Sequence, residues 1–279
     1  MVDIYKDGVG LWYEISGEGP PLALIGGFAL QDKQWEFCLE ELRKHHTVIN
    51  WCHRGAGRSD WTMTEPPCLE HYVEDLRMVL DDAGIEKTAI WGTSTGAPIS
   101  IRFAAKYAAR TDALITYPWL KTDDDWAGIM QAAYLTGKHF DVGAMSRLFA
   151  GAVIPEDLLY AQEGIDYEKW AKEVYADYVN PTTLGWVIDA YCKIDLTGDV
   201  RRLNCPTMLL MGNDSAQNKK ENMASVGYDH LMDVFLSLKK DVEVCAIENA
   251  GSTYCMITRP KECSRQAIDF LRRVLPEAD

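Results

Sequence analysis

The chain has 279 residues, of which 47% are hydrophobic, and its formal net charge is −14. This length and composition predict one large α/β domain, or one domain with an insertion, with ample apolar material for a core. The acidic balance argues against nucleic acid or an anionic membrane surface as a partner, because binding phosphate requires clustered Lys and Arg.

The cysteines and the amino-terminal segment indicate the compartment. Eight cysteines are scattered without a C-x-x-C pair or a zinc-ligand spacing: Cys38, Cys52, Cys68, Cys192, Cys205, Cys245, Cys255 and Cys263. This scatter predicts free thiols in a reducing compartment and no metal site. The first ten residues lack the apolar segment of a secretory signal, and no stretch reaches the length of a membrane span. We therefore expect a cytoplasmic protein without a membrane partner.

Short apolar runs alternate with amphipathic stretches through the first 117 residues. Strands are expected at 9–16, 21–25, 45–51, 87–91 and 112–117, and helices at 35–44 and 71–83. The run Pro21–Ile25 is apolar throughout, as in a strand buried on both faces. The alternation predicts a mostly parallel twisted sheet with helices on both faces.

This alternation stops between residues 118 and 202. The segment has no short apolar strand, is helical in character and is rich in aromatic residues, among them Trp119, Tyr134, Phe140, Trp170, Trp186 and Tyr191. We expect it to form an inserted helical cap. Strands at 205–212 and 242–247 and helices at 218–239 and 259–275 then resume the earlier pattern. The core domain is therefore predicted to comprise residues 1–117 and 203–279.

The most informative motif is Gly92-Thr93-Ser94-Thr95-Gly96, a Gly-x-Ser-x-Gly pattern between a predicted strand and a predicted helix. Small residues are needed in such a nucleophile elbow because its backbone is strained and its neighbours crowd together. The turn lifts the Ser94 hydroxyl above the sheet edge. The Thr95 N–H, at a helix N-terminus, then faces a developing oxyanion. Ser94 is therefore the candidate nucleophile.

Four blocks together resemble the α/β-hydrolase fold family over almost the whole chain. They are Ile25-Gly26-Gly27-Phe28 with Trp35 following, the loop Arg54-Gly-Ala-Gly-Arg-Ser-Asp60, the Ser94 elbow, and Cys205-Pro-Thr through Gly212 with Asn249-Ala-Gly251 and Arg259-Pro260. The resemblance implies the α/β-hydrolase fold with a pocket between core and cap. It also implies that the N–H of Phe28, after Gly27, donates to the oxyanion together with that of Thr95.

Two positions of the implied catalytic triad depart from the family's pattern. The family's acid falls on Ser215, with Asp214 one residue early, and the family's histidine falls on Ser252. A serine hydroxyl is a weak nucleophile until a base removes its proton, and a second hydroxyl cannot replace imidazole near neutral pH. Loss of that histidine costs on the order of a millionfold in kcat, whereas the oxyanion hole and binding alone retain roughly 10³–10⁴ over water.

The six histidines of the chain lie outside the motif: His45, His46, His53, His71, His139 and His230. His45 and His46 are expected at the start of a strand, far from the elbow, and His71 is expected to open a helix as a surface or capping residue. His53 lies on a loop that often borders the active site in this fold. His139 lies in the cap and, with Trp119, is a candidate binding residue.

Three hypotheses stay open. The first is an enzyme diverged from triad hydrolysis, which performs cyclisation, isomerisation, decarboxylation or C–C bond chemistry on a small, largely apolar, aromatic or polyketide-like carbonyl compound. The second is a serine esterase or lactonase present as an inactivated variant, with Ser in place of His at position 252. The third is a non-catalytic ligand receptor or interaction protein.

A weaker likeness to the cofactor-free quinolone dioxygenases of this fold rests on Asn50-Trp51 and on the region of Trp119. It points to a planar aromatic ligand. No organic cofactor or metal is expected, because the chain has neither a dinucleotide fingerprint nor metal-ligand spacing. We expect a monomer or a homodimer with a small-molecule substrate.

Overall fold

A computed structural model describes residues 4–6, 8–27, 29–63, 65–121, 124–141, 144–145, 173–174, 178–213 and 223–275. Seven strands form one sheet in the order β3-β5-β4-β6-β7-β8-β9. They are β3 (Tyr13–Ser16), β4 (Pro21–Ile25), β5 (Thr47–Trp51), β6 (Thr88–Gly92), β7 (Thr111–Thr116), β8 (Thr207–Asn213) and β9 (Val242–Glu248). β3 runs antiparallel to β5, and the other neighbours are parallel. The predicted α/β-hydrolase fold class, with its mostly parallel sheet, is confirmed.

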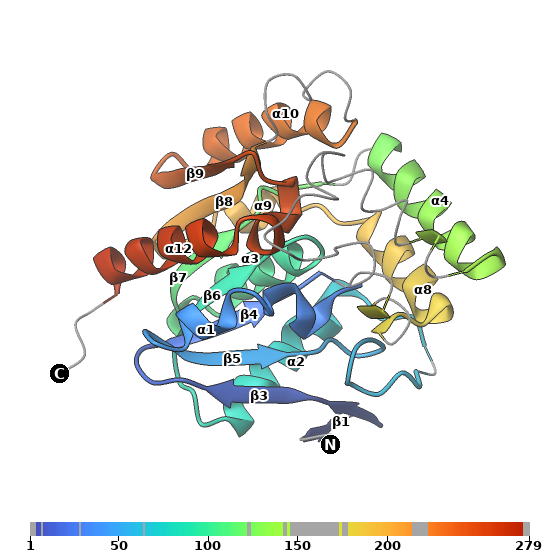
Figure 1. Ribbon diagram of the computed structural model, residues 1–279, viewed down its shortest axis with the longest axis horizontal. Helices are drawn as coiled ribbons and strands as arrows, with labels where there is room; N and C mark the ends of the chain where they lie inside the picture. Colours follow the sequence, from blue (N-terminus) through green and yellow to red (C-terminus); the bar gives the residue numbers. More distant parts are fainter. Residues whose placement is uncertain are drawn as a thin grey trace.

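Helices cover both faces of this sheet. On one face, α1 (Leu39–Leu42) and α11 (Cys255–Thr258) contact α12 (Pro260–Val274). On the other, α2 (Leu69–Asp82) contacts α3 (Gly96–Lys106), which also contacts α9 (Thr197–Val200), and α9 contacts α10 (Met223–Leu238). Figure 1 shows α1 and α12 on the near side of the sheet and α2 behind it. The central strands β4 and β6 are almost completely buried, which explains their apolar sequences.

The described residues between β7 and β8 include the paired helices α4 (Asp124–His139) and α8 (Pro181–Tyr191), followed by α9. α4 and α8 lie together beyond the sheet in Figure 1. An isolated antiparallel bridge joins Lys121 to Asp195 at the two ends of this region. The division into a core and a cap at residues 118 and 202 stays a prediction.

Two predicted elements are wrong in detail. The expected strand 9–16 is interrupted at Trp12, because its N–H donates to Ser59 Oγ (3.0 Å) instead of continuing the ladder. β2 (Val9–Leu11) consequently pairs with β1 (Ile4–Lys6), whereas β3 pairs with β5. The expected helix 35–44 is instead the 3₁₀ helix η1 (Gln31–Trp35) followed by the single turn α1.

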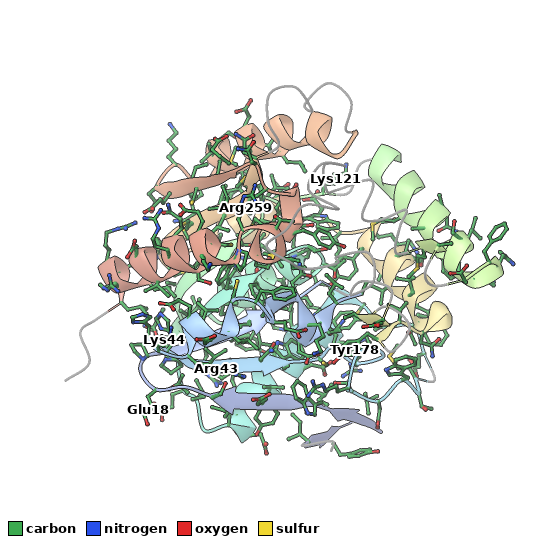
Figure 2. All side chains as sticks on the ribbon, viewed as in Figure 1. Glu18, Arg43, Lys44, Lys121, Tyr178 and Arg259 are labelled. Atoms are coloured by element: carbon green, nitrogen blue, oxygen red, sulfur yellow. The ribbon has the colours of Figure 1, made fainter. Side chains whose placement is uncertain are left out.

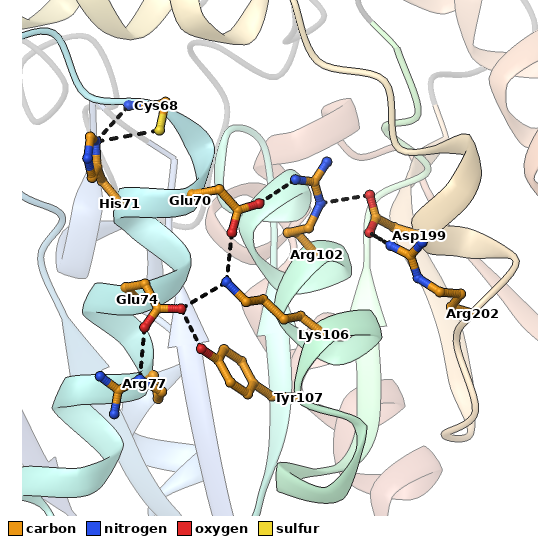
Figure 3. Close-up of polar contacts among 10 residues, drawn as sticks. All are labelled: Cys68, Glu70, His71, Glu74, Arg77, Arg102, Lys106, Tyr107, Asp199 and Arg202. Atoms are coloured by element: carbon orange, nitrogen blue, oxygen red, sulfur yellow. Dashed lines mark hydrogen bonds and ion pairs between the residues drawn. The ribbon is translucent and has the colours of Figure 1, made fainter.

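Charged side chains connect α2, α3 and α9 on the face away from α12 (Figure 3). Arg102 on α3 donates to Asp199 on α9 (2.7 Å) and to Glu70 on α2 (2.5 Å). Lys106 bridges Glu70 and Glu74 at 2.9 and 3.0 Å. The network holds three helices in one arrangement, which is a stronger contribution than isolated surface pairs make.

We expect Glu74→Gln to lower the free energy of unfolding by about 1 kcal/mol at neutral pH. Partial burial acts to raise the Glu74 pKa, but hydrogen bonds from Tyr107, Arg77 and Lys106 lower it to about 2. A lowered carboxyl pKa stabilises the fold fully above the unfolded value of 4.5 and loses that contribution as pH falls toward 2.

Urea unfolding of both proteins at several pH values measures this effect. The difference between wild type and Glu74→Gln should shrink steadily between pH 5 and pH 3. Glu14→Gln, which removes an exposed carboxylate with a single ion pair to Arg43, is the control and should change stability little. A pH-independent difference for Glu74→Gln would contradict the role of the charge network.

No helix in the described part of the chain is long and apolar enough to cross a bilayer.

Candidate active site

Ser94 occupies a strained turn between the central strand β6 and helix α3. Its φ is +52°, in the left-handed region that a non-glycine residue adopts at a cost. The Thr93 N–H donates to the Ile25 carbonyl of β4 (3.1 Å), and the Gly96 N–H donates to the Thr93 carbonyl (2.8 Å). The turn therefore has the backbone conformation expected of a nucleophile elbow.

The two glycines of the elbow leave no room for side chains. A Cβ on Gly96 would lie 2.1 Å from the Ile25 carbonyl oxygen, and one on Gly92 would lie 2.4 Å from Ser100 Oγ. Because neither glycine carries a Cβ, β4, β6 and α3 can approach closely enough to form the turn. They give the physical reason for the Gly-x-Ser-x-Gly pattern at this place.

Gly27 lies against the Ser94 side chain. A Cβ on Gly27 would be 3.0 Å from Ser94 Cβ and 3.1 Å from both Ser94 Oγ and Gln34 Oε1. The Gly27 N–H donates to Gln34 Oε1 (3.2 Å), so it is directed away from an oxyanion. Gly27 therefore contributes space beside the nucleophile. The next residue, Phe28, lies outside the described residues.

Thr95 begins the turn into α3 and is held in place by a hydrogen bond from α8. Its carbonyl accepts a hydrogen bond from the hydroxyl of Tyr191, the last residue of α8 (2.6 Å). Burial raises the Tyr191 pKa, so the hydroxyl keeps the proton that it donates. The Trp119 ring meets the Tyr191 ring edge-on at 6.0 Å between centroids. Trp119 thus contacts Tyr191, which is in turn hydrogen-bonded to the elbow backbone.

The turn after β9 is brought to the elbow through the carbonyl of Thr253. This oxygen accepts from Gln34 Nε2 (3.1 Å) and from Thr93 Oγ1 (3.4 Å). Asn249 starts the turn with a φ of +51°, and the 3₁₀ helix η3 (Ser252–Tyr254) follows. The backbone at position 252 is consequently adjacent to a residue bonded to both Thr93 and Gln34.

The remaining predicted catalytic side chains cannot be placed. Asp214, Ser215 and the side chain of Ser252 lie outside the described residues. Within the ranges that are described, no histidine or carboxylate forms a hydrogen bond with the Ser94 hydroxyl. Nor does this part of the chain contain a group of three or more His, Cys, Asp or Glu that could hold a metal ion.

The placed histidines occupy structural positions. His45 and His46 precede β5, at the end of the sheet opposite Ser94, and His71 accepts from the Cys68 N–H in a capping box at the start of α2 (3.0 Å), as predicted. His139 ends α4 and is exposed. His53 is fully buried between Trp51 and Tyr72, and burial lowers its pKa to about 3. Such a weakly basic imidazole is a poor general base.

The loop after β5 is fixed by a buried ion pair beneath the site. Arg54 donates to both carboxylate oxygens of Asp75 on α2, at 2.6 and 2.5 Å, and the Asp75 side chain is completely buried. The same loop contacts α8 and the residues before it: Thr183 Oγ1 donates to the Gly55 carbonyl (2.8 Å), and the Gly57 N–H donates to the Tyr178 carbonyl (3.1 Å).

Tyr178, labelled in Figure 2, also joins a polar cluster with Arg58 and Asp32. Its hydroxyl lies between Arg58 Nε (3.1 Å) and Asp32 Oδ2 (3.5 Å). Burial raises the Asp32 pKa, although hydrogen bonds from Cys52 and Tyr178 and the charge of Arg58 act to lower it. This cluster anchors the segment before α8 to the core.

Three residues that position the site were not predicted from sequence: Gln34, Thr93 and Tyr191. Their partners are distant in the chain, since Gln34 and Thr253 are separated by 219 positions and Tyr191 and Thr95 by 96. Trp35, beside Gln34, belongs to one of the recognised sequence blocks, and Thr93 lies within the elbow motif. Neither motif specifies a hydrogen bond to a turn so far away.

We expect Gly27→Ala to reduce turnover by about 10- to 100-fold, because the added methyl displaces Ser94 or Gln34 by a few tenths of an ångström. The free energy of unfolding should fall by only about 1–2 kcal/mol. Gly128→Ala is the matched control, since a Cβ there meets no atom within 4 Å. Steady-state kinetics and urea unfolding of both variants measure these effects. Full activity of Gly27→Ala would contradict the position of Gly27 beside the nucleophile.

Comparison with known proteins agrees with this geometry. The family model of the alpha/beta hydrolase fold matches residues 20–151. A protein named as a carbamate hydrolase, RutD, from Azorhizobium caulinodans is 32% identical over 114 residues, which are 40% of this chain and 43% of that protein. The match thus spans less than half of that relative.

Two solved structures superpose over nearly the whole chain. A thermophilic esterase from Thermogutta terrifontis has a TM-score of 0.81 at 19% identity, covering 98% of this chain and 97% of its own. An enol-lactonase from Burkholderia xenovorans has a TM-score of 0.75 at 18% identity, covering 95% and 98%. At such identities these superpositions establish the fold alone.

Proposed function

We propose that this chain, whose residues 20–151 match the family model of the alpha/beta hydrolase fold and whose fold is that of solved α/β hydrolases, is an enzyme that attacks the carbonyl carbon of a small, largely apolar ester, lactone or carbamate through Ser94. The observation that carries this proposal is the Ser94 backbone, strained at a φ of +52° and pressed against Gly27. Strain of this kind persists where the surrounding structure imposes it, and it is concentrated at functional sites.

In the proposed reaction, Ser94 Oγ forms a bond to the carbonyl carbon as its own O–H bond breaks. The carbonyl oxygen becomes an oxyanion that accepts hydrogen bonds from the N–H groups of Thr95 and Phe28. The leaving oxygen or nitrogen departs with the proton released by Ser94, and water then hydrolyses the acyl-enzyme. The substrate lies between the core, residues 1–117 and 203–279, and the cap, residues 118–202.

The names of the relatives support hydrolysis over the other reaction classes. Carbamate hydrolase, enol-lactonase and esterase all describe attack on a carbonyl carbon. With Ser at position 252, no imidazole receives the Ser94 proton from the position that the family uses. Acylation is therefore slow, and the enzyme relies on oxyanion stabilisation and binding, which together retain roughly 10³–10⁴ over water.

Turnover of three compounds tests the proposal: p-nitrophenyl acetate, a six-membered lactone and phenyl carbamate. We expect at least one of them to be hydrolysed about 10³-fold above the buffer rate, through an acyl-enzyme that mass spectrometry detects on Ser94. Ser94→Ala should form no acyl-enzyme, although the oxyanion hole and binding alone leave it a residual rate. Ser237→Ala, a substitution at an exposed serine on α10, is the control and should be fully active. Hydrolysis of none of the three compounds, or hydrolysis without an acyl-enzyme on Ser94, would overturn the proposal.

A second candidate is non-hydrolytic chemistry on an aromatic carbonyl compound, which the serine at position 252 favours because it removes the general base of hydrolysis. Flat aromatic ligands titrated against the protein discriminate between the two candidates. Tight binding without hydrolysis of any carbonyl substrate supports this second candidate or a ligand receptor. In that case, loss of biological activity in Ser94→Ala indicates chemistry, and unchanged activity indicates a receptor.

A further inference from the structure

The side-chain amide of Gln34 is buried between two segments of the candidate site. Gln34 lies in η1 and is 1% exposed. Its Oε1 accepts from the Gly27 N–H (3.2 Å), whereas its Nε2 donates to the Thr253 carbonyl (3.1 Å) and to Met256 Sδ (3.3 Å). A backbone N–H can only donate and a carbonyl can only accept, so these partners determine the orientation of the amide.

These two bonds connect loops that come from different strands of the sheet. Gly27 follows β4 and immediately precedes, in the sequence, the implied oxyanion donor Phe28. Thr253 follows β9 and the position of the implied histidine, and its carbonyl also accepts from Thr93, next to the nucleophile. The side chains of Gln34 and Thr93 therefore both donate hydrogen bonds to the Thr253 carbonyl oxygen. These bonds connect the two loops to the elbow.

We propose that Gln34 is a positioning residue, which couples the loop carrying the oxyanion donor to the turn carrying residue 252. The proposal rests on the function proposed above. Gln34 fixes the plane of the peptide before Gly27. Only the two backbone dihedrals of Gly27 then separate that plane from the peptide that presents the Phe28 N–H. Glycine is the residue with the greatest freedom at those dihedrals, so fixing the plane before Gly27 removes one further source of variation in the direction of the next N–H.

Two substitutions at Gln34 separate this role from simple packing. Gln34→Met preserves the length of the side chain but removes both bonds. Gln34→Glu preserves an acceptor for the Gly27 N–H in either protonation state. Gln31→Met is the matched control, because Gln31 lies in the same buried 3₁₀ helix and its Oε1 also accepts a backbone N–H, that of His53 (2.7 Å).

The experiment follows formation of the acetyl-enzyme by intact-protein mass spectrometry after mixing with p-nitrophenyl acetate, together with steady-state kcat and KM. We expect Gln34→Met to slow acylation about 10- to 100-fold with KM changed less than threefold, since a misplaced donor affects the transition state more than substrate binding. Gln34→Glu should recover most of the rate. Gln31→Met should acylate at close to the wild-type rate with a similar loss of stability.

The outcomes distinguish this inference from the function on which it rests. Acylation of Gln34→Met within twofold of wild type, or equal losses in Gln34→Met and Gln31→Met, would overturn the positioning role and leave Ser94 as the nucleophile. Absence of an acyl-enzyme in the wild-type protein with all three compounds named above would overturn the proposed function, and this inference with it.

Discussion

Ser252→His is expected to raise the turnover of the best ester or lactone substrate by about 10²–10⁴-fold. The full effect of a triad histidine is on the order of a millionfold in kcat, but it requires an acid that orients the imidazole, and here the implied position of that acid holds Ser215. The backbone supports the substitution, because the adjacent Thr253 carbonyl is already bonded to Thr93, next to the nucleophile.

The gain should disappear in the double variant Ser94→Ala/Ser252→His, which separates true nucleophilic catalysis from hydrolysis by an exposed imidazole. The pH dependence of kcat should also show a new rise near pH 6.5, where an ordinary histidine loses its proton. Ser252→Gln is a control of similar size that has no titrating group. A gain of less than threefold for Ser252→His, or one that survives Ser94→Ala, would contradict hydrolysis through Ser94.

Asp75→Leu is expected to lower the free energy of unfolding by about 3–5 kcal/mol. The Asp75 carboxylate is completely buried, and each of its two oxygens accepts a hydrogen bond from the Arg54 guanidinium group. Removing it leaves a buried arginine without its counter-charge, which costs more than the loss of the ion pair as a whole. The double variant Arg54→Met/Asp75→Leu should therefore recover most of the stability.

Urea denaturation of the three proteins measures both effects. Asp189→Asn, which removes an exposed i,i+4 partner of Lys193, is the control and should change stability by less than about 0.5 kcal/mol. The loop of Arg54 contacts Thr183 on α8, beside the proposed substrate site, so Asp75→Leu should also raise KM. A loss below 1 kcal/mol for Asp75→Leu would contradict the role of the buried pair.

The fold could be predicted from sequence because its strands are unusually clear. β4 is short and wholly apolar, β6 is short and mostly apolar, a glycine lies at the carboxyl end of each, and the elbow motif joins β6 to α3. Predictions failed where a backbone group bonds outside the regular pattern. Trp12 donates to Ser59 and interrupts a strand, and Gln31, with a φ of +51°, begins a 3₁₀ helix where α-helix was expected slightly later in the chain.

The candidate site was predicted less completely than the fold. The Ser94 elbow and the space at Gly27 follow from glycine patterns, which report local crowding. The hydrogen bonds of Gln34 and Tyr191 join residues far apart in sequence, so no local pattern contains them. His139 was predicted as a binding residue and lies exposed at the end of α4, a position that helical periodicity alone could not determine.

The most direct test of the account is to locate the covalent intermediate. The protein is mixed with p-nitrophenyl acetate, quenched in acid during the first turnover, digested and mapped by mass spectrometry. We expect one acetyl group on the peptide that contains Ser94, in wild type and more rapidly in Ser252→His, with none in Ser94→Ala. Hydrolysis without an adduct on Ser94, or an adduct at another residue that persists in Ser94→Ala, would contradict it.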